Sequence, residues 1–305
     1  MKKYYTRACN FYYGNHAKLL IKKKLALPLC GAKDIAFDQI EIFKRENNSA
    51  TSRIIKTKNI KKLSISIKKK IQKDLKKIVK KRKNFLQNVN FLEPSIMGIL
   101  NITPDSFSDG GKFYKKEKAK NRVREMIKEG AKIIDVGGES TRPGSKTVKT
   151  KNELQRIDNV LKNFKKNHKK ICLSIDTRKT KVMIRAIKCG ANLINDVSGF
   201  SYDKQSLLKL KKYDIAKVLH HMKGTPNTMQ KNPKYKNVLL DIYDFFEKGI
   251  KKIKNSKIII DPGIGFGKNL KHNLTLISKI SLFHSLGLPI LVGTSRKKFI
   301  SQISG

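Results

Sequence analysis

From residue 95 onward, short apolar runs alternate with longer stretches in which apolar residues recur every three or four positions. The short runs are rich in Ile, Val and Leu and are bounded by Gly, Pro or Asn, a pattern that predicts buried strands. Seven such runs are present, at residues 95–103, 132–139, 170–177, 192–199, 216–221, 257–263 and 289–295. The stretches between them have the period of amphipathic helices, as at 115–130, 151–167, 179–190 and 234–254.

Strands that alternate with helices at this spacing indicate βαβ units and a parallel sheet covered on both faces. An open doubly wound sheet and a closed barrel both satisfy that pattern. Two observations favour the barrel: no G-x-G-x-x-G motif follows the first strand, and nearly every strand ends in polar residues. We therefore expect an α/β chain with a TIM-type (β/α)8 barrel, of which seven strands are present, plus a small N-terminal extension.

Residues 1–90 differ in pattern from residues 91–305, and we place a domain boundary between them. A β-rich element is predicted near 38–43 (DQIEIF). Residues 56–83 are strongly basic, yet apolar residues recur there at helical steps: Ile60, Leu63, Ile67, Ile71, Leu75 and Ile78. Such a helix can bind a membrane surface or nucleic acid, but we favour a helix that packs its apolar stripe on a neighbouring domain. Asp38, Asp74 and the lysines of this segment are expected at the surface.

The chain has 69 Lys and Arg residues against 23 Asp and Glu, a formal net charge of +46. This excess is mostly Lys and runs along the whole sequence, whereas nucleic-acid binders concentrate it in one patch. We therefore favour a solvated basic surface, which attracts anionic small substrates, and expect neither a nucleic-acid nor a membrane partner. The four cysteines show no zinc-type or disulfide-type spacing, which fits a cytoplasmic protein.

Polar residues stand at the end of every predicted strand. These are Asn101, Glu139 with Thr141, Asp176, Asn195, His220 with His221, Asp261, and Ser295 with Arg296 and Lys297. In a barrel they converge on the C-terminal mouth, where a ligand can satisfy them. Carboxylates and an amide at Asp176, Asn195 and Asp261 suit a planar heterocycle with amino and ring N–H groups.

Two glycine-rich loops, at residues 105–111 and 137–144, offer hydroxyl and backbone N–H groups to an anion, and Arg142, Arg296 and Lys297 add positive charge. No arrangement of Ser, His and Asp or of Cys and His indicates a protein nucleophile. His220 and His221 are expected to support neighbouring groups rather than to act as bases.

These segments carry a family resemblance. MGILNITPDSFSDGG, IIDVGGESTRPG, SIDTRK, LINDVSG, IIIDPGIGFGKNLKHN and LVGTSRKKFI closely resemble the pterin-binding barrel of dihydropteroate synthases, over about residues 95–305. The resemblance implies a folate-pathway transferase that condenses 6-hydroxymethyl-7,8-dihydropterin diphosphate with 4-aminobenzoate to 7,8-dihydropteroate and diphosphate. It also implies Mg2+ as cofactor, a sulfonamide target and a homodimer when the chain is full length.

The resemblance assigns site residues by motif position. The catalytic residues would be Asp176, Asp261, Lys297 and Asn101, with Asn101 also at the Mg2+ site. The pterin would be bound by Asp176, Asn195, Met222, Asp261, Phe266, Gly293 and Lys297. The 4-aminobenzoate and diphosphate loops would contribute Asp105, Ser106, Phe107, Thr141, Arg142, Pro143, Ser295 and Arg296.

The sequence departs from the family after its seventh strand. The family's last strand, with an Arg and a His that help to bind diphosphate, has no counterpart before Gly305, and we expect the chain to be a fragment of a longer protein. Catalysis is expected to be weak or absent if it is not. Two alternatives remain, a pterin-dependent methyltransferase barrel and a basic nucleic-acid-binding protein that uses residues 60–82. The loops DSFSDGG and GGESTRPG favour the synthase over the methyltransferase.

Overall fold

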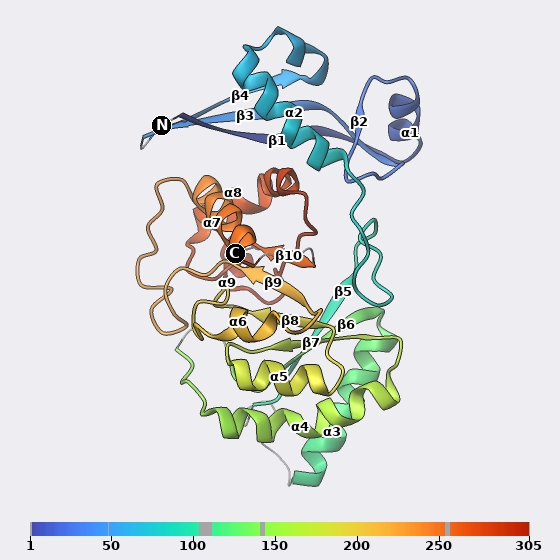
Figure 1. Ribbon diagram of the computed structural model, residues 1–305, viewed down its shortest axis with the longest axis vertical. Coiled ribbons are helices and arrows are strands. Elements are labelled where there is room, and N and C mark those ends of the chain that lie inside the picture. Colours follow the sequence, from blue (N-terminus) through green and yellow to red (C-terminus); the bar gives the residue numbers. More distant parts are fainter. Residues whose placement is uncertain (1, 48, 104–111, 141–143, 254–256, 305) are drawn as a thin grey trace. The chain divides into compact units, whose positions relative to one another are not determined.

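The structure is a computed structural model that describes residues 2–47, 49–103, 112–140, 144–253 and 257–304 (Figure 1). The chain forms two compact units. The first comprises Met1–Lys83, Lys234–Glu247 and Lys271–Ile290, and the second comprises Asn84–Pro233, Lys248–Leu270 and Leu291–Gly305. None of the helices in the described parts of the chain has the length and apolar character of a membrane-crossing segment.

An antiparallel sheet forms the centre of the first unit. Its long strands are β1 (Lys2–Tyr13) and β3 (Ile35–Glu46), which pair from Lys2 opposite Glu46 to Tyr13 opposite Ile35. The strands β2 (Leu27–Pro28) and β4 (Ser49–Lys56) pair with β3, and α1 (Gly14–Lys22) connects β1 to β2. The β element predicted near residues 38–43 is confirmed, because it lies inside β3.

The basic segment 56–83 folds as the 3-10 helix η1 (Thr57–Lys62) and the helix α2 (Ile65–Val79). Its predicted apolar stripe is confirmed, since Ile71 and Ile78 are fully buried and pack with Phe37 and Ile40 of β3. The stripe therefore packs on the sheet of its own unit, and the prediction that it packs on a neighbouring domain is wrong.

The prediction of Asp74 at the surface is wrong. Asp74 is 2% exposed, and its carboxylate accepts hydrogen bonds from Thr6 Oγ1 at 2.8 Å and from Lys70 Nζ at 2.6 Å. It lies three residues after Ile71, on the buried face of α2, where Thr6 of β1 and Lys70 of the same helix stabilise it.

Two helical segments from later in the chain complete the first unit. These are the first turns of α7 (Val238–Ile253), and α8 (Leu270–Ser278) with the 3-10 helix η3 (Ile280–Leu286). The Tyr5 ring packs edge-on against Tyr243 at 5.1 Å, and Arg45 Nη1 lies 3.1 Å from the Asp244 carboxylate. The N-terminal sheet is thus joined to α7 by both apolar and ionic contacts.

The second unit is built on a parallel sheet of six strands. They are β5 (Ile96–Asn101), β6 (Ala131–Gly137), β7 (Cys172–Asp176), β8 (Leu193–Asp196), β9 (Ala216–His220) and β10 (Ile258–Asp261). Each strand pairs with the one before it in sequence, as expected for a barrel, whereas an open doubly wound sheet reverses its strand order.

Helices connect these strands, and Figure 1 shows α4 and α5 side by side along one face of the sheet. They are α3 (Lys112–Lys128), α4 (Thr150–Asn167), α5 (Thr180–Lys188), the short α6 (Ser206–Leu210) and, after the last strand, α9 (Lys298–Ser304). Helices were predicted at the positions of α3, α4, α5 and α7, and these are confirmed.

Six of the seven predicted strands form as expected. The seventh, at residues 289–295, contributes one bridge at Ile290 and one hydrogen bond, from Leu291 N–H to the Ile260 carbonyl at 2.9 Å. With this sparse hydrogen bonding the segment does not form a regular strand, so this predicted strand is not confirmed in the described part of the chain.

One end of the sheet is closed by apolar side chains. Leu86 and Val89 pack against residues near the strand starts, such as Cys172, Leu193 and Ala216. Asn88 Nδ2 fixes this segment by donating to the Lys170 carbonyl at 2.6 Å. The apolar core thus lies at the N-terminal ends of the strands, and the polar residues lie at the opposite ends.

Candidate functional site

Three predicted strand-end residues, Asn101, Asp176 and Asn195, lie in one line across the sheet with Gly137 of β6. Asn101 of β5 pairs with Gly137 of β6, Gly137 pairs with Asp176 of β7, and Asp176 pairs with Asn195 of β8. We call Asn101, Gly137, Asp176 and Asn195 the strand-end row. Because the strands are parallel and in sequence order, each strand brings its last residues to the same edge.

Asp135 of β6 joins this row from two positions earlier in its strand. It is 3% exposed, and its Oδ2 accepts a hydrogen bond from Asn195 Nδ2 at 2.8 Å. The sequence analysis missed it because only the last residue of each strand was considered. A usable signal was present, since residues two apart on a strand share a face, and Asp135 shares that of Gly137.

Several buried side-chain oxygens at this edge have no hydrogen-bond partner among the described residues. They include three acceptors, Asp135 Oδ1, Asp176 Oδ1 and Asn195 Oδ1, and the hydroxyl of Ser174, which pairs with Asp135 across β7 and β6. Buried polar atoms in folded proteins are almost always hydrogen-bonded, and an orphaned one costs roughly 1–3 kcal/mol. Three acceptors together therefore match a ligand that carries several N–H donors.

Burial and mutual repulsion raise the pKa values of the carboxyl groups here. The pKa of Asp176 lies well above its usual range, first because of burial and then because of the negative charges of Asp135 and Asp196. Burial also raises the pKa of Asp135, and it raises that of Asp196 to about 6. Such a group of carboxyls favours a ligand that carries positive charge or gains it during a reaction.

A second group of residues gathers at the ends of β9 and β10. Asp261 of β10 pairs with His220 of β9, and its Oδ1 accepts the N–H of Gly263 at 2.7 Å. The Phe266 ring packs edge-on against His220 at 4.8 Å, and Lys297 Nζ lies 4.0 Å from the Phe266 ring centroid. The structure thus brings three predicted pterin residues, Asp261, Phe266 and Lys297, into one neighbourhood.

Lys268 braces the loop between β10 and α8. Its buried ammonium group donates to the carbonyls of Gly263 and Phe266, each at 2.8 Å, and lies 3.2 Å from His221 Nδ1. Burial lowers the pKa of Lys268 to about 7. Burial also lowers the pKa values of His220 and His221, which fits the supporting roles expected for them.

Behind the row lies a cluster of buried ion pairs formed by Glu139, Glu153, Arg178 and Lys179. Glu139 Oε2 accepts from Arg178 Nη2 at 2.9 Å, and its Oε1 lies 3.0 Å from Lys179 Nζ. Glu153 accepts from Lys179 Nζ at 2.5 Å and from Thr177 Oγ1 at 2.6 Å. We call these four residues the ion-pair cluster. It joins the segments after β6 and β7 to the first turn of α4. Of its members, the sequence analysis had singled out Glu139 alone.

The remaining predicted site residues belong neither to the strand-end row nor to the group at the ends of β9 and β10. Met222 is half-buried directly after β9, whereas Gly293, Ser295 and Arg296 are exposed on the segment after Ile290. Within the described residues no hydrogen bond or ion pair joins the side chains of Ser295 and Arg296 to the strand-end row. Asp105, Ser106, Phe107, Thr141, Arg142 and Pro143 lie outside the described residues.

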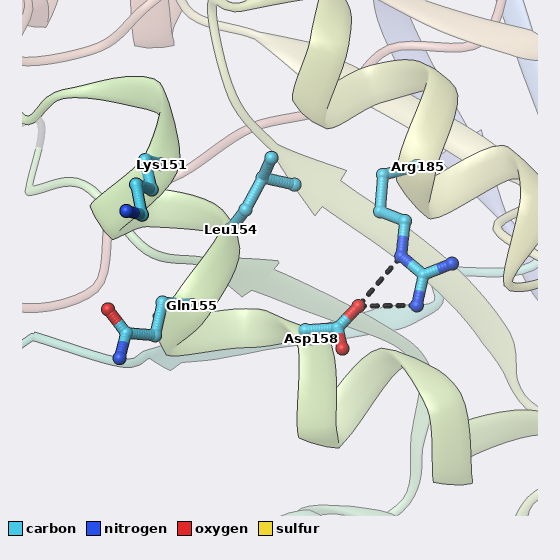
Figure 2. Close-up of a pocket in the computed structure, with 5 residues that line it drawn as sticks. All are labelled: Lys151, Leu154, Gln155, Asp158 and Arg185. Carbon is cyan, nitrogen blue, oxygen red and sulfur yellow. Dashed lines mark hydrogen bonds and ion pairs between the residues drawn. The ribbon is translucent and has the colours of Figure 1, made fainter.

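No group of three or more His, Cys, Asp or Glu side chains in the described ranges is arranged to hold a metal ion. A groove on the helical layer is also not a catalytic candidate. Figure 2 shows its lining residues, Lys151, Leu154, Gln155, Asp158 and Arg185. Its one acid, Asp158, is held by Arg185 Nε at 2.7 Å and Nη2 at 2.5 Å.

Comparison with known proteins identifies the family. Residues 97–305 match the family described as pterin binding enzyme. The dihydropteroate synthase of Escherichia coli (strain K12) is 41% identical over 221 residues, which cover 71% of this chain and 78% of that protein. The dihydropteroate synthase of Clostridium beijerinckii is 46% identical over 210 residues, covering 67% of this chain and 75% of the relative.

Solved structures agree with these relatives. A Yersinia pestis dihydropteroate synthase with a sulfonamide drug complex has a TM-score of 0.66 at 39% identity, covering 71% of this chain and 80% of that one. The Xanthomonas albilineans enzyme with 4-aminobenzoic acid has a TM-score of 0.67 at 33% identity, covering 73% and 82%. The chain therefore belongs to the dihydropteroate synthases of the pterin-binding family, which are barrel-fold transferases of folate biosynthesis.

Proposed function

We propose that the strand-end row of this dihydropteroate synthase holds 6-hydroxymethyl-7,8-dihydropterin diphosphate for attack by 4-aminobenzoate. The observation that carries the proposal is the set of orphaned oxygens on Asp176, Asn195 and Asp135. The amino and ring N–H groups of a pterin are the donors that these oxygens lack. Asp261 accepts from the same ligand, and Met222, Phe266 and Gly293 line its pocket.

The reaction needs no protein nucleophile. The amino nitrogen of 4-aminobenzoate attacks the methylene carbon, a C–N bond forms, and the C–O bond to diphosphate breaks with its electron pair leaving on oxygen. Positive charge develops on the pterin as that bond breaks, and the fixed carboxylates of Asp176 and Asp261 stabilise it. Lys297 donates to the carbonyl side of the ring. The proton lost from the new amine leaves to solvent.

The diphosphate and the arylamine are assigned to the loops. Asp105, Ser106, Phe107, Thr141, Arg142, Pro143, Ser295 and Arg296 are proposed to hold them, on the strength of their motif positions. The strongly positive chain attracts both substrates, which are anionic.

Mg2+ is the proposed cofactor, with Asn101 as its protein ligand. Mg2+ prefers oxygen donors and takes much of its coordination from water and substrate phosphates, so one half-buried amide oxygen at the end of the row fits such a site. When bound, the ion neutralises charge on the leaving diphosphate.

Two further proposals concern the protein as a whole. We propose a cytoplasmic location, supported by the four free thiols in the described structure. We also propose a homodimer when full length, supported by the family resemblance, and sedimentation of the purified protein tests it.

The proposed function is tested by incubating the protein with the pterin diphosphate, Mg2+ and labelled 4-aminobenzoate. Labelled 7,8-dihydropteroate is expected, and its formation should fall when a sulfonamide competes with 4-aminobenzoate. Chelation of Mg2+ should lower the rate. Folded full-length protein that forms no condensed product, or that transfers a methyl group from methyltetrahydrofolate instead, would contradict the proposal.

A further inference from the structure

Gly137 ends β6 and lies between Asn101 of β5 and Asp176 of β7 in the strand-end row. A Cβ atom placed on it would lie 3.3 Å from Asn101 Oδ1, 3.4 Å from Asp176 Cβ and 3.5 Å from Asp176 Oδ2. The space over its Cα is therefore bounded by one side chain from β5 and one from β7.

The backbone does not explain a glycine at this position. Gly137 is not among the glycines with a positive φ, so an L-residue can adopt its conformation. Core packing does not explain it either, because the atoms that a Cβ would meet belong to site residues.

The next residue, Gly138, shows the contrasting case. A Cβ there would lie 2.9 Å from Ile157 Cγ2 and 3.0 Å from Glu153 Cγ, in the core beneath α4. Gly138 is thus required for close packing of the helix on the sheet, whereas a Cβ on Gly137 would meet only the side chains of Asn101 and Asp176 in the strand-end row.

We infer that the space over Gly137 receives the methylene group that joins the pterin ring to the diphosphate, which makes Gly137 a specificity-determining position. This inference rests on the proposed function. The pterin lies at Asp176 and Asn195, the diphosphate lies at Asn101, and two strand spacings of about 4.8 Å separate β7 from β5. The substrate must therefore cross β6, and the residue that it crosses is Gly137.

Gly137→Ala tests this inference, with Gly138→Ala as the matched control. Because one extra methyl group overpacks this space, the variant should lower kcat/KM for the pterin diphosphate by roughly 10- to 100-fold. Affinity for 7,8-dihydropterin, which lacks the bridging carbon altogether, should stay within about threefold of wild type because that probe does not cross β6. Gly138→Ala should instead lower the melting temperature, as its Cβ clashes with the core.

A second measurement uses the wild-type chain and does not depend on the folding of a variant. A pterin diphosphate with a methyl group on the bridging carbon should lose kcat/KM by a similar factor. Equal losses for both pterin probes in Gly137→Ala, or full activity with the methylated substrate, would overturn the inference while wild-type turnover still supports the proposed function. Failure of the wild type to bind the unmodified pterin diphosphate would overturn both.

Discussion

The strand-end row, with Asp135 beside it, and the ion-pair cluster that follows β6 and β7 both contain buried carboxyl groups, but they differ in how their oxygens are satisfied. In the ion-pair cluster every carboxylate oxygen of Glu139 and Glu153 has a partner within 3.2 Å. In and beside the row, Asp176, Asn195 and Asp135 each keep one oxygen without a partner among the described residues.

This difference separates a structural role from a binding role. Buried charges that are paired and fully hydrogen-bonded hold segments together, and removing one partner leaves the other uncompensated. Buried acceptors without donors cost stability in the free protein, and a ligand with matching donors recovers that cost. We expect mutations in the ion-pair cluster to lower the stability of the fold, and mutations in the strand-end row to weaken substrate binding and catalysis.

The largest expected effect is the loss of a cluster cation. Lys179→Met removes the partner of Glu153 and one partner of Glu139, and should lower the free energy of unfolding by about 3–5 kcal/mol. Urea unfolding followed by circular dichroism measures it. Lys181→Met, at an exposed position two residues along, is the control and should leave the urea midpoint unchanged. Equal midpoints for the two variants would show that the cluster does not stabilise the fold.

Asp176→Ala should lower activity without lowering stability. Loss of one preorganised group that stabilises developing charge costs roughly 10²–10³ in kcat. The melting temperature should not fall, because the variant removes a buried, partly unsatisfied carboxylate. Lys297→Ala should give a comparable loss of activity. Lys73→Ala on α2, an exposed lysine, is the control with near wild-type rates. Full activity in Asp176→Ala would mean that the pterin lies elsewhere.

The sequence predicted three members of the row, for a physical reason. Each parallel strand ends at the same edge, so the last polar residue of a run identifies Asn101, Asp176 and Asn195 without knowledge of the packing. For β6 the same rule selected Glu139, which belongs to the ion-pair cluster, and it missed Asp135, two residues inside that strand.

The rule also missed Lys268. Its oxygen and nitrogen neighbours belong to His221 after β9 and to Gly263 and Phe266 in the loop after β10, contacts that no sequence period describes.

Partners distant in sequence account for the other differences between the predictions and the structure. Asp74 is buried with Thr6, 68 residues away, donating to it, and the ion-pair cluster joins residues from two different connections, β6 to β7 and β7 to β8. The segment 289–295 has the composition of a strand, but regular pairing also depends on its neighbours. Local pattern therefore gives the elements and their ends, while the satisfaction of buried groups depends on tertiary contacts.

Asp135→Asn should produce a shift in pH dependence. The pKa of Asp176 is raised by burial first and by the charge of Asp135 next, so removing that charge should lower the pKa of Asp176. Binding that requires ionised Asp176 should then persist to lower pH, and the acidic limb of kcat/KM should move down. Asp158→Asn, on the outer face of α4, is the control.

Asp135→Asn should also change how the stability of the fold depends on pH. A buried carboxyl with a raised pKa holds its proton more tightly in the folded state, so wild-type stability falls as pH rises above about 4, the pKa of an unfolded Asp. Asp135→Asn removes that loss, and its advantage in melting temperature over wild type should be larger at pH 8 than at pH 4. An unchanged acidic limb, with no gain at pH 8, would contradict the influence assigned to Asp135.

The smallest effect is expected at the groove between α4 and α5. The Arg185–Asp158 pair has good geometry there, but solvent reaches both side chains, and exposed ion pairs contribute little because water competes for each charge (Figure 2). Arg185→Ala should leave kcat/KM at the wild-type value and give the smallest change in melting temperature of these variants. A loss of activity comparable to that of Asp176→Ala would show that hydrogen-bond satisfaction does not distinguish binding groups from structural ones in this chain. An unchanged rate would agree with catalytic chemistry at the strand-end edge of the sheet, where buried oxygens lack donors.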